Sequence, residues 1–385
     1  MFKRLIVICV ILLSLVACSS NVQIDFEVEM NSTPLALSVP EPAPTSKIEA
    51  TTNYNLKSPW DTRLFKSDAA LLSGQCPDPK GLPTQIPDRL ENGENDETAW
   101  ATLTNIDGIL LLSDLAVSKG SQAAATCVLD HLNYWAENDA FIVDKECRID
   151  GAHWEHGYDR SNFTNGVLAI PFLQIRNAPI LDKAKKTNVL SWFEKLYLCN
   201  RTRAEGMLLD AQENGLGPHN QLYPALLAVA TTSLVLDKTD GFNWSIEKYK
   251  QSIGTIAEDG TALNEVANKM EWTLHYHTVI ENFCVHLSLL GHLNGFTGLF
   301  EEPSFLRLTQ LVLDSYDDPT YIEELTGYEQ TQNPLTTPWN LSWVEHLKRF
   351  NTDPRLSQLA TKFKWQMNHT HTGGHPEYWW VEYWE

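Results

Sequence analysis

Basic residues are scarce in this sequence. It has 29 lysines and arginines against 49 aspartates and glutamates, which gives a formal charge of −20 at pH 7. A chain of this sign repels phosphate backbones, so the composition argues against nucleic-acid binding. It also fits poorly with an anionic polysaccharide as ligand. Strong acidity often serves solubility, however, so a local basic cleft is compatible with it.

Runs of alternating apolar and polar residues, which would indicate half-buried strands, are also lacking. Apolar residues recur at helical spacings instead, and the fold class that we predict is all-α. Long helices joined by loops, without heptads or an exact internal repeat, indicate stacked helical hairpins. Helices are predicted at residues 98–119, 122–137, 165–174, 182–197, 224–236, 245–256, 304–316 and 341–350, with a central helix within 259–293.

Closely spaced cysteines, which would indicate a zinc site, are absent. Beyond Cys9 and Cys18 the chain has five cysteines, an odd number that leaves at least one thiol free. Cys284 lies within the predicted central helix, where a cysteine usually acts as a small buried hydrophobe.

The C-terminal segment offers two further constellations. A group of three histidines is weighed as a metal site, but a loop or a substrate contact explains it more simply (His369, His371, His375). Neighbouring tryptophans are weighed as sugar-stacking platforms, although most tryptophans of an all-helical core serve packing (Trp379, Trp380, Trp384).

The N-terminus reads as a signal peptide followed by a tether. Lys3 and Arg4 precede an apolar run that is too short to span a bilayer, so residues 1–17 are predicted to be a signal peptide. The run closes with Leu-Val-Ala-Cys, which resembles the lipobox of bacterial lipoproteins, with Cys18 as the lipidated residue. Ser19 after it implies sorting to the outer membrane. Residues 18–54 are predicted to be a flexible tether, and residues 55–385 the folded domain.

A stretch from Asp259 to Leu293 carries the most distinctive pattern. Gly260 marks a turn, and the residues that follow form one stripe of an amphipathic helix (Tyr276, Ile280, Phe283, Leu287, Leu290). Lys269 precedes Tyr276 by seven residues and therefore falls two turns earlier on that stripe. An inward-facing lysine and tyrosine need a polar partner. The structural alternative is a packed tyrosine with a satisfied hydroxyl and a lysine that reaches solvent.

A second polar segment lies just before a helix that we predict to begin at Pro224. The residues after Pro224 are apolar all round, so this helix should be buried. His219, Asn220 and Gln221, together with free N–H groups at the helix start, would form an anion site. The alternative is that Asn220 only caps the helix.

The sequence Asp-Gly-x-x-x-Asn-Glu, a basic residue and then Leu-His-Tyr-His is similar to the central motif of the family 5 polysaccharide lyases, the bacterial periplasmic alginate lyases. Looser matches in the same order extend the resemblance over about residues 75–350. The resemblance implies an incomplete (α/α) toroid and cleavage of mannuronate-rich alginate without a cofactor or a metal. It also implies a disulfide between Cys76 and Cys127.

Elimination from a uronate requires that the carboxylate be neutralised, that a base remove the C5 proton and that an acid protonate the leaving O4 oxygen. By resemblance, Tyr276 transfers the proton and Asn220 holds the carboxylate. Two positions depart from the family. Gln221 stands where the family has histidine, and either it replaces that donor or His219 takes over. Lys269 stands for an arginine, and it could lower the pKa of Tyr276 as a point charge without forming a bidentate fork.

The resemblance further implies three substrate-binding residues. Arg89 is the counterpart of a lysine on a lid segment, and Tyr223 belongs to the segment before the buried helix. His277 matches the family's Tyr-His, but it points about 100° away from the stripe of Tyr276, so we assign it mostly a structural role.

Three functional hypotheses follow. The first is a lipid-anchored polyuronate lyase of the periplasm or cell surface, which acts as a monomer on an anionic polysaccharide. The second is a glycoside hydrolase on an α/α scaffold, with a carboxylate pair drawn from Glu258, Asp259 and Glu265. Acids at a helix entry also serve the helix dipole, which weakens that hypothesis. The third is a non-catalytic glycan-binding surface lipoprotein, which the departures at Gln221 and Lys269 permit.

Overall fold

The computed structural model describes residues 54–60, isolated positions between 76 and 116, and residues 121–142, 147, 158–331, 338–363 and 367, without the side chains of 158–164 and 339. These residues belong to the second of two units into which the chain divides, residues 49–385. The predicted signal peptide, nearly all of the tether, Arg89 and the C-terminal histidines and tryptophans lie outside the described residues.

Helices make up most of the described part of the chain, and none of the described residues belongs to a β-strand, so the all-α prediction is confirmed. None of the described helices is both long and apolar enough to cross a membrane. The helices are α3 (Gln122–Glu137), α4 (Tyr158–Ile175), α5 (Lys183–Asn214), α6 (Leu222–Leu236), α7 (Thr239–Ile253), α8 (Leu263–Lys269), η2 (Met270–Trp272), α9 (Thr273–Leu293), α10 (Pro303–Asp317), α11 (Thr320–Thr326), η4 (Pro338–Leu341), α12 (Ser342–Leu347) and α13 (Pro354–Lys362).

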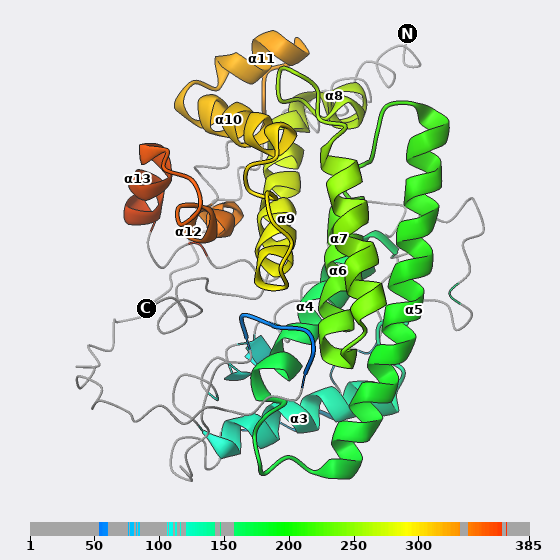
Figure 1. The fold of residues 1–385 in the computed structure, drawn as a ribbon. Coiled ribbons are helices and arrows are strands. Elements are labelled where there is room, and N and C mark those ends of the chain that lie inside the picture. Colours follow the sequence, from blue (N-terminus) through cyan, green and yellow to red (C-terminus); the bar gives the residue numbers. More distant parts are fainter. Residues whose placement is uncertain are drawn as a thin grey trace, which may run out of the picture. The chain divides into compact units, whose positions relative to one another are not determined.

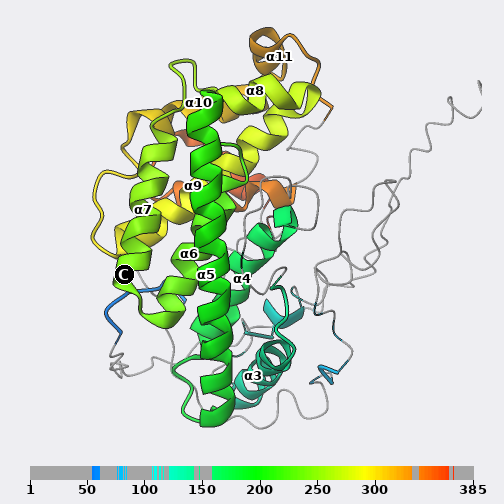
Figure 2. The same cartoon turned by 90° about the vertical axis from the view of Figure 1, so that its right-hand side faces the viewer.

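Helix α6 is the core of this arrangement. It packs against α4, α5, α7 and α9, and Figures 1 and 2 show it enclosed by these neighbours. Every residue from Leu222 to Val235 is buried, as expected for a helix that is apolar on all sides. The helix begins at Leu222, two residues before the predicted start, so Pro224 lies in the first turn, where its missing N–H is harmless.

Helix α5 is much longer than the helix predicted at residues 182–197, and two short helices were missed. Helix α5 continues to Asn214, because no proline interrupts it and α3 and α6 support it along its side. It ends where Gly215 adopts a left-handed φ of 67°. The short helices α11 and α13 were not predicted, since each offers at most two turns of pattern.

The predicted central helix is broken. Met270 has φ 46° and ψ −112°, a conformation that residues with a side chain rarely adopt, and it separates α8 from η2 and α9. The stripe of apolar residues holds within α9, where Ile280, Phe283, Leu287 and Leu290 are fully buried. Continuous helical spacing between Lys269 and Tyr276 is therefore wrong, although the two side chains still meet.

Two disulfides fasten the segments before α6. The structure joins Cys76 to Cys127, the pairing that the resemblance implied, and it joins Cys147 to Cys199, a pairing that was not predicted. Cys284 is left as a buried free thiol. His131 lies beside the first disulfide at a distance suited to a metal site, but paired cysteines offer no thiolate.

Candidate active site

The segment before α6 brings three polar side chains together. His219 and Gln221 are half-buried and Asn220 is fully buried. The predicted free N–H groups are not available, because those at positions 221, 222, 223 and 225 donate to Nδ1 of His219 or to the carbonyls of residues 219, 220 and 221. An anion must therefore be held here by side chains. Asn220 does not cap α6, so that alternative is wrong as well.

Asn220 is held by Glu265, which reaches across from α8. The backbone N–H of Asn220 donates to Oε1 of Glu265 at 2.7 Å, and Nδ2 of Asn220 donates to Oε2 at 3.2 Å. Both residues are buried, and Oδ1 of Asn220 has no hydrogen-bond partner among the described residues. Oε1 of Gln221 is likewise buried without a partner there. The side-chain amide oxygens of Asn220 and Gln221 are thus both buried without a hydrogen-bond donor among the described residues.

The turn that leads into α8 explains the Asp-Gly pair of the motif. Oδ1 of Asp259 accepts hydrogen bonds from the N–H of Thr261 at 2.9 Å and from its hydroxyl at 2.6 Å. Gly260 has φ 89°, and a Cβ there would lie 2.5 Å from the carbonyl oxygen of Arg307. Only glycine allows this close approach of the turn to α10. Asn264, later in the motif, donates to the carbonyl of Gly217 at 3.1 Å and ties α8 to the segment before α6.

Lys269 and Tyr276 meet across the break between α8 and α9. Nζ of Lys269 lies 4.5 Å from the centroid of the Tyr276 ring, a cation–π geometry. Tyr276 is half-buried in the first turn of α9. The left-handed backbone at Met270 turns the chain so that the last residue of α8 faces this first turn. Lys269 and Tyr276 are therefore brought together by the break at Met270, and not by the continuous helix that their spacing predicted.

A glutamine from beyond α11 supports the kink. Oε1 of Gln330 accepts the N–H of Leu274 at 2.9 Å, and its Nε2 donates to the carbonyl of Met270 at 3.2 Å. Thr331 adds a backbone hydrogen bond from its N–H to the carbonyl of Glu271 at 2.9 Å. The N–H of Leu274 is one of the unpaired donors that every helix start exposes, so Gln330 both caps α9 and holds the strained turn.

Two aromatic residues beside Tyr276 were not predicted as site residues. The ring of His275 packs edge-on against Tyr276, with centroids 5.0 Å apart, and Trp272 packs edge-on against His275 at 6.1 Å. Trp272 is 39% exposed, whereas Trp135, Trp192 and Trp343 are buried in the core. The adjacency of Glu-Trp-Thr-Leu-His-Tyr in the sequence is the signal that could have found them.

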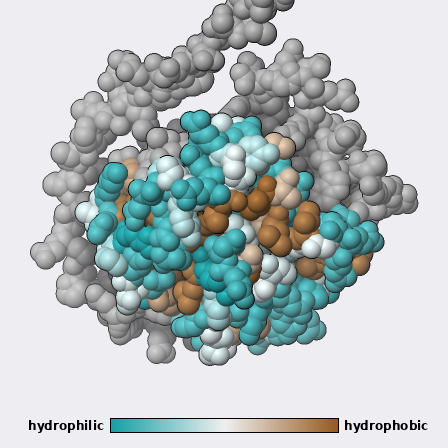
Figure 3. All heavy atoms as spheres, turned by 90° about the horizontal axis from the view of Figure 1, so that it is seen from above, coloured by the Kyte–Doolittle hydropathy of each residue, from teal (hydrophilic) through white to brown (hydrophobic). Residues whose placement is uncertain are grey.

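Apolar side chains are also exposed on α8, α10 and α11. Figure 3, seen from above the ends of α8, α10 and α11, shows hydrophobic residues gathered in a band between hydrophilic ones. The exposed large hydrophobic residues of these elements and of η2 are Leu263, Met270, Trp272, Leu306, Tyr321 and Leu325.

The charges of the site depend on burial. Burial lowers the pKa of His219 to about 4, with a further contribution from the nearby charge of Lys269, and burial alone lowers the pKa of His275 to about 4. Both imidazoles are therefore neutral at pH 7. Burial raises the pKa of Glu265 to about 7, against the opposing effects of Asn220 and Lys269. Lys269 acts on both His219 and Glu265, so it carries positive charge into a site whose other groups are mostly neutral.

Two residues that the resemblance implied as substrate contacts, His277 and Tyr223, are buried. His277 is fully buried, accepts the N–H of Ala262 at Nε2 (2.8 Å) and pairs through Nδ1 with the carbonyl of Thr273 (2.8 Å). This is the structural role that we assigned to it. Tyr223 is 1% exposed and its hydroxyl faces the carbonyl of Ser252 at 3.5 Å. Both side chains direct their polar atoms to groups of the protein, which supports structural roles for them.

The chain resembles known proteins in sequence. The model of the family described as "Alginate lyase" matches residues 51–320. An alginate lyase of Pseudomonas fluorescens strain SBW25 is 24% identical over 225 residues, covering 57% of this chain and 56% of that protein. An alginate lyase of Pseudomonas aeruginosa strain LESB58 is 23% identical over 264 residues, covering 66% and 67%. The match to the first of these relatives thus spans little more than half of its length.

The fold resembles solved structures of the same kind. Alginate lyase A1-III from Sphingomonas species A1 superposes with a TM-score of 0.60 at 19% identity, covering 77% of this chain and 82% of that chain. A histidine-to-alanine variant of A1-III complexed with a tetrasaccharide gives a TM-score of 0.59 at 19% identity, covering 76% and 81%. The fold is therefore the (α/α) toroid that the resemblance implied. Because the family match extends over residues 51–320, the chain belongs to the alginate lyase family.

Proposed function

We propose that this protein is a polysaccharide lyase that cleaves alginate by β-elimination, with mannuronate-rich chains as its substrate. The observation that carries the proposal is the position of Lys269. Its ammonium group lies against the ring of Tyr276, and its charge also acts on His219 and Glu265 beside Asn220. The proton-transfer residue and the amide site, which come from different parts of the sequence, thus share one cation.

The chemistry of elimination suits these groups. When the C5 proton leaves, negative charge grows on the uronate carboxylate, and amide donors from Asn220 and Gln221 stabilise it more strongly in the transition state than in the ground state. Tyr276 in its phenolate form takes the C5 proton, the C4=C5 double bond forms as the C4–O4 bond breaks, and Tyr276 returns the proton to the leaving O4 oxygen. The ammonium of Lys269, which lies against the ring of Tyr276, stabilises the phenolate. The imidazoles of His219 and His275 are neutral and add no further positive charge.

The carboxylates of the site argue against the hydrolase hypothesis. Asp259 is exposed and its carboxylate is committed to the Thr261 turn, which lowers its pKa through those hydrogen bonds. Glu265 is buried and committed to Asn220, and Glu258 is exposed outside the helix. A hydrolase needs two carboxyl groups that flank the bond to be cleaved. Here Asp259 stabilises a turn, Glu265 binds Asn220 and Glu258 lies at the surface, so these acids do not form such a pair.

The experiment that tests the proposal is a substrate panel. Polymannuronate, polyguluronate and glucuronan are incubated with the protein, and the absorbance of the unsaturated product is followed together with reducing ends. A lyase produces a conjugated double bond, a hydrolase produces reducing ends alone, and a glycan-binding protein produces neither. Absorbance that rises fastest with polymannuronate is the expected result. Reducing ends without absorbance would establish the hydrolase instead.

Trp272 is expected to stack on a sugar next to the cleaved bond. It is exposed, and its ring packs against His275, which in turn packs against Tyr276. Trp272→Ala should raise KM by about 10-fold or more, since an aromatic contact contributes about 1–3 kcal/mol, and should change kcat less. Trp272→Phe should restore most of the affinity. Steady-state kinetics on polymannuronate measures both, and an unchanged KM in Trp272→Ala would contradict the assignment.

We also propose that Cys18 is lipidated and anchors the protein in the outer membrane, facing the periplasm or the cell surface. Support comes from the Leu-Val-Ala-Cys sequence after an apolar run and from Ser19 behind it. Cys18→Ser should release the protein into the soluble fraction, because serine cannot carry the lipid chain. Wild-type protein that fractionates with the soluble variant would refute the anchor.

A further inference from the structure

The side-chain amide of Asn220 has a donor end and an acceptor end, and only the donor end suits a carboxylate. In the structure Nδ2 donates to Oε2 of Glu265, while Oδ1 is buried without a partner among the described residues. A free Oδ1 repels an anion. The amide as it stands therefore offers the wrong atom to a uronate.

Glu265 decides this orientation because it holds Asn220 at two points. Its Oε1 accepts the backbone N–H of Asn220 whether or not the acid is ionised. When Glu265 is ionised, its Oε2 can only accept a hydrogen bond and therefore pairs with Nδ2 of Asn220. When Glu265 is protonated on Oε2, this atom can donate a hydrogen bond and therefore pairs with Oδ1 of Asn220. A rotation of the amide by half a turn exchanges these two arrangements with no change of backbone.

The groups around Glu265 have opposing effects on its pKa. Lys269 on its own helix is the charged group that favours the carboxylate, and Asn220 favours it through both hydrogen bonds. Tyr223 faces it from α6 as a neutral phenol, and His219 beside Lys269 is a neutral imidazole at pH 7. Burial opposes these effects and brings the pKa of Glu265 to about 7.

We propose that Glu265 is a positioning residue whose neutral form turns the donor end of Asn220 toward the carboxylate of the substrate. The inference rests on the proposed function, since it concerns how a uronate is held. In the neutral form the acid proton sits on Oε2 and is donated to Oδ1 of Asn220, and Nδ2 is released with both of its hydrogens. Loss of that proton returns the amide to the arrangement seen in the structure.

Uronate binding and proton uptake are then coupled. A bound carboxylate adds negative charge near Glu265, which favours its neutral form, so binding draws a proton onto Glu265. The neutral form is fully present well below pH 7 and is lost as the pH rises through about 7. The sign of the effect is therefore a loss of kcat/KM on the alkaline side.

The test compares the pH dependence of kcat/KM for the wild type and Glu265→Gln on polymannuronate, because kcat/KM reports the groups of the free enzyme. Glutamine imitates the neutral acid, since its amide donates to Oδ1 of Asn220 and its oxygen accepts the backbone N–H. Other titrating groups cancel in the ratio of wild type to variant. That ratio should be constant below about pH 6 and fall about 10-fold per pH unit above about pH 8.

Three further variants separate positioning from mere packing. Glu265→Ala should lower kcat/KM at every pH, whereas Glu265→Gln should stay within about 10-fold of wild type at pH 6. In an Asn220→Ala background, Glu265→Ala should add little, because the two residues act as a unit. Glu258→Gln, at an exposed acid on the preceding turn, is the matched control and should follow the wild-type profile.

Difference infrared spectroscopy of the free protein provides a readout that needs no substrate. A carbonyl band of a neutral carboxylic acid that disappears near pH 7 in the wild type should be missing in Glu265→Gln, whereas the band of the other buried acid, Glu281, whose pKa burial raises to about 8, should remain in both proteins. Identical pH profiles for the two proteins, or a folded Glu265→Gln that is as impaired as Glu265→Ala, would overturn the inference. If the wild type made no unsaturated product, the proposed function would fail, and an absent infrared band would overturn the inference separately.

Discussion

Tyr276→Phe is expected to lower kcat on polymannuronate by about 10²–10⁴ while the protein stays folded. The phenylalanine ring keeps the contacts that Tyr276 makes with His275 and with the ammonium of Lys269. Only the hydroxyl is lost, and with it the group that transfers the proton. KM should change little, because the amide site around Asn220 still holds the carboxylate. The rate is measured from the absorbance of the unsaturated product.

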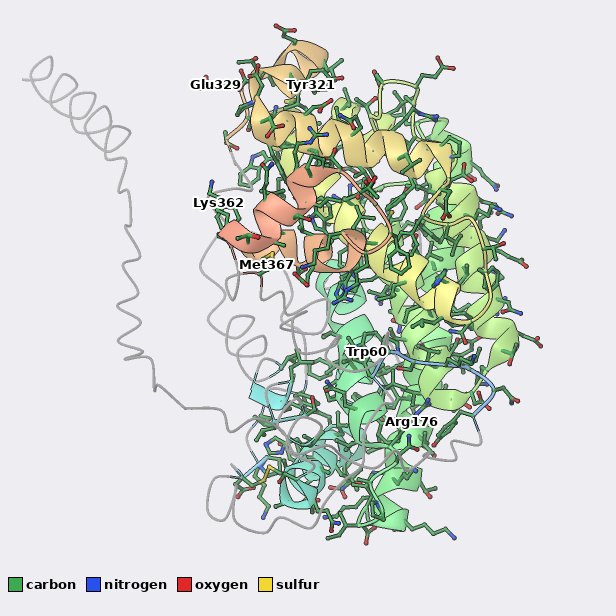
Figure 4. All side chains as sticks on the ribbon, turned by 60° about the vertical axis from the view of Figure 1, so that its left-hand side comes forward. Trp60, Arg176, Tyr321, Glu329, Lys362 and Met367 are labelled. Atoms are coloured by element: carbon green, nitrogen blue, oxygen red, sulfur yellow. A yellow bond between two sulfur atoms is a disulfide. The ribbon has the colours of Figure 1, made fainter. Side chains whose placement is uncertain are left out.

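Tyr321→Phe is the matched control for this substitution. Tyr321 lies on the outer side of α11, where Figure 4 shows it among surface side chains, and it is 39% exposed. It also loses one hydroxyl, so it should retain wild-type kcat. Circular dichroism and the thermal midpoint of both variants should match the wild type. Near-normal kcat in a folded Tyr276→Phe protein would remove Tyr276 from the mechanism.

Removing the disulfide between Cys76 and Cys127 is expected to lower the free energy of unfolding by about 4 kcal/mol. The two cysteines are 51 residues apart, and opening this cross-link restores chain entropy to the unfolded state. The double substitution Cys76→Ser with Cys127→Ser creates no new unpaired thiol beside the buried Cys284. Denaturant unfolding of the variant and of the wild type under non-reducing conditions measures the difference.

The second disulfide provides an internal comparison. Cys147 and Cys199 are 52 residues apart, so Cys147→Ser with Cys199→Ser should cost nearly the same free energy if loop entropy dominates. A large inequality between the two pairs would show that contacts in the folded state, and not the loop lengths, set their contributions. Mass mapping that found Cys76 and Cys127 unpaired in the oxidised protein would contradict the first prediction altogether.

The sequence by itself determined the fold class and most of the core. Apolar residues on every side of α6 required its burial, and Ile280, Phe283, Leu287 and Leu290 placed one face of α9 inside. These inferences succeed because helical periodicity and burial are local properties that a single segment carries. The candidate site residues Asn220, Lys269 and Tyr276 were likewise found in the sequence, through their resemblance to a motif.

Tertiary structure decided how those residues are used. Local periodicity predicted one continuous helix through Lys269 and Tyr276, but the hydrogen bonds of Gln330 to Leu274 and Met270 hold a break there. A contact between residues more than fifty positions apart leaves no periodic trace in either segment, so the sequence alone could not reveal it.

The same reason applies to Glu265. As a sequence feature it was an acid near a helix start, one of three in a possible carboxylate pair. Only packing of α8 against the segment before α6 buries it, gives it Asn220 as a partner and raises its pKa to about 7. Burial depends on which segments meet, and the charge of an acid depends on burial. The residue types were thus present in the sequence, while their protonation and partners came from the assembled helices.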